Sequence, residues 1–208
     1  MDTKTKIVQT ALALFNEQGV DVITVRHIAK EMGISHGNLC YHFPNTDTII
    51  RQLYDQLVEQ LTSQIGGVIT GPLSLNRLAE LVGEVMQMLY DYRFLMLDFA
   101  GIMRRIPDLR DKHRALVSSR KLAFQHILTQ LRALGKLREE LYDGHDDDLL
   151  EQFFIVGDFW LSSATILYEG AEENKIKHYQ QVFLSLIVPC LTNKGLTEWK
   201  DIDRKKTL

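Results

Sequence analysis

Apolar residues recur at helical spacing along almost the whole chain, and no strand-like alternation competes with them. Ile7, Ala11, Leu14 and Phe15 form one face of a first helix, which we expect to end at Gly19 because glycine readily takes the left-handed conformation of a helix cap. A longer stripe follows at Ile49, Leu53, Leu57, Leu61 and Ile65. This pattern predicts an all-α fold.

Glycine and proline mark the breaks between the predicted helices. Two short helices are predicted before the long one, over residues 24–32 and then up to residue 43. The first linker signal covers residues 66–72, and the composition places a domain boundary within or just before it. Five further helices are predicted over residues 73–90, 92–106, 108–134, 146–169 and 174–193. The segment after Gly195 has few apolar residues and is predicted to be a loose tail.

Composition excludes several classes of protein. The fractions of hydrophobic and charged residues, 45% and 25%, are those of ordinary globular domains. The two cysteines, Cys40 and Cys190, are too few for a thiolate zinc site or a disulfide framework, so we expect reduced thiols. No signal peptide is expected, and the most apolar stretch, residues 94–103, is too short for a membrane helix. We therefore expect a cytoplasmic protein without membrane contact.

Charge is distributed unevenly along the chain. Residues 104–138 hold ten Lys and Arg against two acidic residues, whereas residues 139–174 hold eleven acidic residues and no Lys or Arg. One interpretation of the basic block is a surface for nucleic acid or an acidic partner. We favour the solvated face of an amphipathic helix, because the cations alternate with apolar residues at core spacing. The net charge of −3 argues against non-specific coating of nucleic acid.

The most specific motif begins at Val25 and has the spacing of a helix-turn-helix. A helix-turn-helix needs a small residue where its two helices cross, a glycine to turn the chain, and apolar residues that hold the second helix on the first. With Val25 as the first position, Ala29 is fifth, Gly33 ninth and Leu39 fifteenth. Ile28, Met32 and Ile34 complete the buried set. The spacing predicts this motif.

The exposed residues of the second short helix favour contact with DNA. They are donors, acceptors and an aromatic ring without any carboxylate: Ser35, His36, Gly37, Asn38, Tyr41 and His42. Asparagine reads adenine through two hydrogen bonds, and Ser, His and Tyr suit phosphate oxygens. A helix exposed only for solubility would normally carry Glu and Lys pairs instead.

Residues 24–43 resemble the signature of the TetR/AcrR-type bacterial transcriptional regulators, and the resemblance covers roughly the first 50 residues. It implies a three-helix DNA-binding domain, a larger helical domain for ligand binding and dimerisation, and repression of a palindromic operator that a small molecule relieves. We assign residues 1–47 to the DNA-binding domain, 48–195 to the larger domain and 196–208 to a flexible tail.

The resemblance also implies a role for individual residues at the DNA. It places Thr24, Val25 and Arg26 on backbone phosphates, and it places His42 with Thr46 on phosphates again. Within the major groove it places His36, Gly37, Asn38 and Tyr41, and we add Ser35 to the candidate DNA contacts. Residues 1–65 hold five Lys and Arg against seven acidic residues. We therefore expect weak, salt-sensitive binding that depends on dimer geometry.

Two departures from the family pattern bear on DNA binding. Cys40 stands where family members commonly have tyrosine, and Thr46 stands where they commonly have lysine, which should weaken the interaction. Cys40 also raises the alternative of a redox-sensitive thiol between His36 and His42, although burial against the helix pair is the simpler account. The alternative function is an all-helical ligand-binding or interaction protein that no longer binds DNA.

Aromatic and methionine residues gather in the predicted helices after residue 73 and suggest an adaptable apolar pocket for a largely apolar effector. The candidate lining residues are Met86, Tyr90, Phe94, Leu97, Asp98, Met103, Phe124, Ile127 and Phe154. Tyr90, His126 or Asp98 are the candidate polar groups that would orient the ligand. The alternative is that these residues form an ordinary core.

The last two long helices each offer a wide apolar face that suits a two-fold bundle between protomers. The candidate interface residues are Phe153, Val156, Trp160, Ala164, Leu167, Tyr179, Val182, Phe183 and Leu186. The alternative is that these faces close the core of a monomer. No nucleophile motif or metal-ligand spacing is present, so we expect neither catalysis nor a metal or other cofactor.

Overall fold

The computed structural model describes residues 2–69 and 71–206. These residues form eleven α-helices and contain no strand, which confirms the all-α prediction. The helices are α1 (Thr3–Gln18), α2 (Val25–Glu31), α3 (His36–His42), α4 (Thr46–Ile69), α5 (Leu75–Asp91), α6 (Arg93–Leu97), α7 (Phe99–Arg105), α8 (Pro107–Ala133), α9 (His145–Leu167), α10 (Lys175–Ser185) and α11 (Asn193–Lys206). Two short 3-10 helices lie at Glu172–Asn174 and Val188–Cys190. None of the described helices is long and apolar enough to cross a lipid bilayer.

Short polar side chains fix where several helices begin. The Asp2 carboxylate accepts the backbone N–H of Thr5 at 2.7 Å at the start of α1. At the start of α4, the Asn45 side chain accepts the N–H of Thr48 at 3.0 Å. Each cap satisfies a backbone donor that the helix itself leaves unpaired, so these residues set the helix boundaries.

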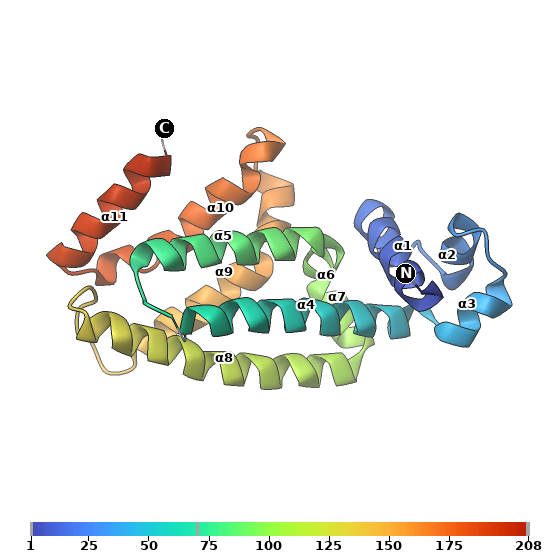
Figure 1. Ribbon diagram of the computed structural model, residues 1–208, viewed down its shortest axis with the longest axis horizontal. Helices are drawn as coiled ribbons and strands as arrows, with labels where there is room; N and C mark the ends of the chain where they lie inside the picture. The colour runs from blue at the N-terminus through green and yellow to red at the C-terminus, as the bar shows by residue number, and fades with distance from the viewer. Residues whose placement is uncertain (1, 70, 207–208) are drawn as a thin grey trace.

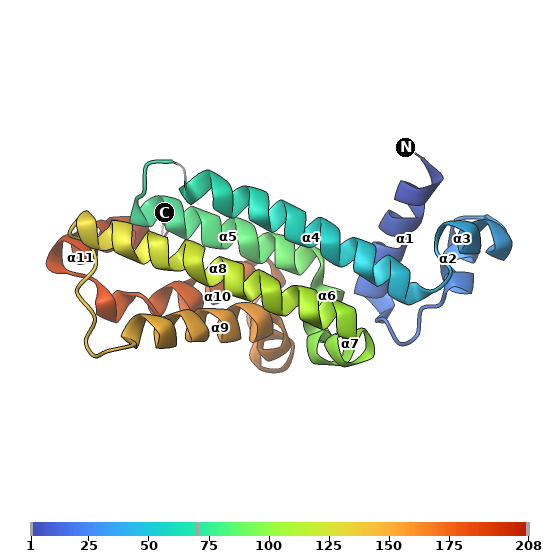
Figure 2. The ribbon, with the colours of Figure 1, turned by 90° about the horizontal axis from the view of Figure 1, so that it is seen from below.

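The molecule is elongated, with a small head at one end of a helical body (Figure 1). We use head for α1–α3 and body for α5–α11. Helix α4 starts at the head and continues along the body, where it packs against both α5 and α8. Within the body, helices α9 and α10 pack on each other, and α11 lies at the end opposite the head (Figure 2). Helix α4 therefore connects the head to the body.

The head and the body share one hydrophobic core. The Phe15 ring of α1 packs on the Phe94 ring of α6 with centroids 5.1 Å apart. The Asn16 side chain donates to the carbonyl of Asp91 at 2.7 Å and accepts the N–H of Phe94 at 3.1 Å. These contacts hold the head in a defined orientation relative to the body.

Three predicted helix boundaries are wrong. The helix predicted over residues 92–106 is divided into α6 and α7, because the backbone at Asp98 leaves the helical region with φ −115° and ψ 30°. The helix predicted over residues 174–193 ends at Ser185, and Pro189 lies in the 3-10 turn that follows. Helix α4 continues through Gly66 and Gly67, so the linker starts later than predicted.

The prediction of a flexible tail over residues 196–208 is wrong for residues 196–206, which belong to α11; residues 207–208 lie outside the described part of the chain. Leu196, Trp199 and Ile202 recur at three-residue spacing and pack into a separate hydrophobic cluster of the body, formed with residues of α5, α8, α9 and α10. Glu198 accepts the N–H of Leu75 at 2.8 Å and pairs with Lys136 at 2.7 Å. The spacing of these few apolar residues, more than their number, is what lets α11 pack.

Candidate DNA interface and ligand cavity

Helices α2 and α3 cross as a helix-turn-helix, as the motif predicted. Ile28, Ala29 and Leu39 are buried at the crossing, and Leu39 has no exposed surface. The turn between the helices uses Gly33, whose φ of 65° favours glycine, and the N–H of Ile34 donates to the Ala29 carbonyl at 3.0 Å. The turn and the buried leucine together fix the angle at which α3 leaves α2.

Both helices of the motif are capped by their own side chains. The Thr24 hydroxyl accepts the N–H of His27 at 3.4 Å, and the His27 Nδ1 atom accepts the N–H of Thr24 at 3.2 Å, which is a reciprocal capping box. The Ser35 hydroxyl accepts the N–H of Asn38 at 3.1 Å at the start of α3. Thr24 and Ser35 therefore hold the helices that would contact DNA, besides offering their own hydroxyl groups.

All ten predicted DNA-contacting residues are exposed or half-buried, and they lie in the head or at the start of α4. The exposed ones are Thr24, Arg26, Ser35, His36, Gly37, Asn38 and Tyr41, and the half-buried ones are Val25, His42 and Thr46. The Tyr41 side chain is 86% exposed, and its ring contacts the His42 ring edge-on with centroids 5.2 Å apart. Neither Arg26 nor Lys30 forms an ion pair with any residue that the structure describes, so both cations remain open to phosphates.

Cys40 is half-buried on α3, and its sulfur lies 3.4 Å from the Nε2 atom of His36. The thiol is therefore less enclosed than the burial interpretation expected. Since His36 is itself a predicted groove residue, Cys40 helps to set the position of that imidazole ring.

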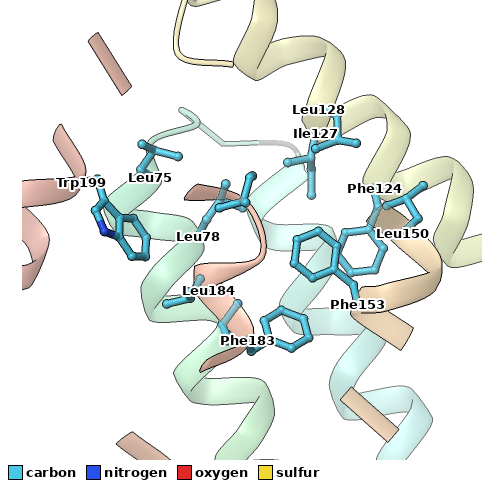
Figure 3. Close-up of a pocket in the computed structure, with 12 residues that line it drawn as sticks. Leu75, Leu78, Phe124, Ile127, Leu128, Leu150, Phe153, Phe183, Leu184 and Trp199 are labelled. Carbon is cyan, nitrogen blue, oxygen red and sulfur yellow. The ribbon is translucent and has the colours of Figure 1, made fainter. Parts of the chain in front are cut away.

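The body contains two adjacent apolar cavities. The inner cavity has a volume of about 100 Å³ and lies among α4, α5, α8, α9 and α10. The end cavity has a volume of about 60 Å³ and extends to Trp199 of α11. Both share the side chains of Val82, Phe124, Phe153 and Phe183 as walls. Figure 3 shows the aromatic rings gathered in the end cavity.

Two charged residues, Arg120 of α8 and Asp158 of α9, line the otherwise apolar inner cavity. The Nη2 atom of Arg120 is buried and has no hydrogen-bond partner among the described residues. Burial lowers the pKa of Arg120 from its ordinary value. Asp158 lies 3.5 Å from the Nε2 atom of His113. The sequence analysis predicted neither charge in the cavity. Arg120 was assigned to the solvated face of the basic block. Asp158 did carry a signal, because it is the one acidic residue between Glu151 and Glu169.

Only some of the predicted pocket residues lie at the two cavities. Met86, Phe124 and Phe154 line the inner cavity, and Phe124 and Ile127 line the end cavity. The remaining five candidates line neither cavity: Tyr90, Phe94, Leu97, Asp98 and Met103.

The break at Asp98 accounts for the four of these candidates that lie on or between α6 and α7, because it turns both helices into the core next to the head. Phe94 and Met103 are buried in that core, whereas Leu97 is 43% exposed. Tyr90 donates to Glu172 at 2.6 Å. Asp98 is half-buried, and burial raises the pKa of its carboxyl group.

The predicted dimer-interface residues are also divided between surface and core. Trp160, Ala164 and Tyr179 are buried within the protomer, so their assignment to an interface is wrong. Phe153 and Phe183 line the cavities, and Val156 and Leu186 are half-buried. Leu167 and Val182 are exposed, together with three α9 residues that were not predicted: Ile155, Phe159 and Ile166. We call these five exposed residues the α9–α10 strip.

Comparison with known proteins identifies related sequences for both parts of the chain. Residues 7–53 match the model for bacterial regulatory proteins of the tetR family, and residues 53–199 match the TetR model for a bacterial transcriptional repressor. A negative transcriptional regulator of the biofilm operon icaADBC, IcaR from Staphylococcus aureus, is 30% identical over 91 residues, which cover 44% of this chain and 46% of IcaR. The matched segment thus spans about half the length of that relative.

Solved structures extend the similarity to nearly the full chain. A TetR-family transcriptional regulator from Marinobacter aquaeolei VT8 has a TM-score of 0.87 at 25% identity, with 98% of each chain covered. The ketosteroid transcriptional regulator KstR2 of Mycobacterium tuberculosis has a TM-score of 0.69 at 17% identity, with 92% of this chain and 96% of that chain covered. The second structure supports the fold alone.

Proposed function

Because this chain belongs to the TetR family of bacterial transcriptional regulators, we propose that it is a repressor that binds a roughly palindromic operator as a homodimer and releases it when a small, largely apolar molecule occupies the body. The observation that carries this proposal is the exposed face of α3, a helix without acidic residues on which Asn38 and Tyr41 are both exposed. The relative IcaR, described as a negative regulator, supports repression as the direction of control.

The acidic residues among residues 1–65 do not oppose DNA binding as strongly as their number suggests. Arg105 of α7 pairs with Asp21 at 3.5 Å and with Asp47 at 3.2 Å. Lys112 of α8 pairs with Asp55 at 3.0 Å. These pairs place three carboxylates against cations of the body, which leaves the exposed cations Arg26 and Lys30 for phosphate contacts.

A path from the cavity to the head runs through α4 and α8. Tyr54 of α4 contacts the Nδ1 atom of His113 at 3.0 Å, and His113 lies against Asp158 at the inner cavity. Arg51 of α4 forms a two-point contact with Asp108 at 2.8 and 2.9 Å. A ligand that moves α8 would therefore displace α4 and change the separation of the two heads in a dimer, favouring the conformer that does not bind DNA.

We expect the α9–α10 strip to form the dimer interface, because exposed apolar patches on soluble proteins commonly mark such contacts. Ile166→Asp places a charge on a residue that is 80% exposed, so it should leave the protomer folded while converting the dimer to monomers. The measurement is sedimentation velocity. The matched control is Leu122→Asp on α8, at a leucine 70% exposed, which should remain dimeric. A dimeric Ile166→Asp protein would place the interface elsewhere.

Repression is tested with a reporter gene fused to the DNA upstream of the gene for this protein. Expression should fall when the protein is supplied and rise when the protein is absent. Higher expression in the presence of the protein would contradict repression, and unchanged expression would contradict control of this promoter.

A further inference from the structure

Arg120 of α8 carries a charged group that lines the inner cavity of the body. Its Nη2 atom is buried and lacks a hydrogen-bond partner among the described residues. A guanidinium keeps its positive charge in proteins, so this group cannot escape the cost of burial by losing a proton. The Arg120 side chain is half-buried, and Asp158 and Tyr54 interact with its charge without a hydrogen bond to it, so the Nη2 donors stay unpaired at a cost in desolvation.

The neighbouring polar groups already have partners. Burial raises the pKa of Tyr54 to about 12, so its hydroxyl stays protonated and can donate to the Nδ1 atom of His113 at 3.0 Å. The Nε2 side of His113 then faces Asp158 at 3.5 Å. Asp158 forms no ion pair with Arg120, although both line the inner cavity. The guanidinium therefore retains donors for a carboxylate that comes from outside the chain.

The surroundings of Arg120 select an apolar molecule. The rest of the inner cavity is lined mainly by aliphatic and aromatic side chains, and the rings of Phe153 and Phe183, with centroids 4.9 Å apart, belong to the walls of both cavities. A volume of about 100 Å³ is smaller than the roughly 300 Å³ at which ordinary ligand sites begin. Movement of these two rings would join the cavities into one elongated apolar space that extends from Arg120 toward Trp199. Figure 3 shows both rings and Trp199 in the end cavity.

We propose that the effector is an elongated apolar carboxylic acid whose carboxylate binds the guanidinium of Arg120 and whose apolar tail displaces the rings of Phe153 and Phe183. This inference rests on the proposed function, because it names the class of molecule that releases the operator. Planar, two-point pairing between guanidinium and carboxylate supplies the selectivity for the acid. Displacement of the rings supplies the change in packing that α8 and α9 transmit.

The test compares three probes that share one alkyl chain: decanoate, 1-decanol and decylamine. Binding to the full-length protein is measured by calorimetry, with carboxylates of eight to fourteen carbons as a length series. Decanoate or a neighbouring length should bind at least about tenfold more tightly than its alcohol, the range expected for a hydrogen bond to a charged group. Equal affinity for acid and alcohol, a preference for decylamine, or no binding across the series would overturn the proposal.

The variant Arg120→Met distinguishes binding of the carboxylate to Arg120 from non-specific attraction of anions to the protein. It should reduce carboxylate affinity about tenfold, to the level of the alcohol, because the charge-assisted bond is lost. The matched control is Arg114→Met, at an exposed arginine of the same helix, which should bind as the wild type does. If Arg120→Met does not fold, Arg120→Lys keeps the charge, loses the planar fork, and should bind the acid with intermediate affinity. Unchanged affinity in a folded Arg120 variant contradicts the proposal.

Operator retardation, measured with the same proteins, distinguishes this inference from the function on which it rests. If the protein retards operator DNA but no carboxylate binds or releases it, the inference fails and the proposed function stands. If the carboxylate binds through Arg120 but no DNA is retarded, the proposed function fails and the binding site stands. Release of the DNA by decanoate from the wild type, and not from Arg120→Met, is the result expected.

Discussion

The double variant Asn38→Ala, Tyr41→Ala is expected to bind operator DNA about 100-fold more weakly than the wild type, since each well-placed base contact contributes about 1–3 kcal/mol. Both side chains project from α3, and neither belongs to the core. The cap of α3 uses the backbone N–H of Asn38, which an alanine retains. The variant should therefore stay folded and dimeric while losing affinity.

Fluorescence anisotropy with a labelled operator fragment measures this loss, and circular dichroism with sedimentation confirms the folded dimer. The matched control is Glu17→Ala, Gln18→Ala, because both residues are exposed at the end of α1 in the same head. The control should bind with wild-type affinity. If the α3 variant also does so, α3 is not the helix that reads DNA.

Leu39→Ala should lower the free energy of unfolding by about 2–5 kcal/mol, the usual cost of removing a fully buried leucine side chain. Leu39 has no exposed surface and holds α3 against Ile28 and Ala29 of α2. The variant should also lose operator binding, although Leu39 itself need not contact DNA, because the orientation of α3 depends on the Leu39 side chain. Urea unfolding followed by circular dichroism measures the change.

Leu122→Ala is the matched control for the leucine deletion. Leu122 is 70% exposed on α8, so its loss should change the free energy of unfolding by no more than about 0.5 kcal/mol. Equal effects of the two substitutions would show that Leu39 does not hold the motif together.

The parts of the fold that the sequence predicted well depend on neighbours along the chain. The caps at Thr24 and Ser35 act across three residues, and Gly33 sets a turn between adjacent helices. By contrast, α11 is held by contacts such as Glu198 with Leu75, 123 positions apart. The few apolar residues of α11 stabilise it only because they pack on a surface that is distant in sequence. The number of apolar residues alone therefore predicted a loose tail.

The same difference between local and long-range contacts explains which candidate site residues were predicted correctly. The DNA-contacting residues were found because the motif sets their spacing on one short helix. Whether an aromatic residue fills core or lines a cavity depends on helices that are remote in sequence, which is why Phe94 and Phe154 look alike in the sequence and lie in different places. Arg120 was missed because one cation that turns inward is indistinguishable, in sequence, from its solvated neighbours on α8.

Retardation of the DNA upstream of its own gene by the ligand-free wild-type protein, combined with footprinting across a salt series, tests whether this protein binds an operator as a dimer. We expect one complex that contains two chains, protection of a roughly palindromic site with half-sites separated by about one helical turn, and affinity that falls steeply as salt increases. A folded, dimeric protein that fails to retard this DNA even at low salt would contradict this expectation.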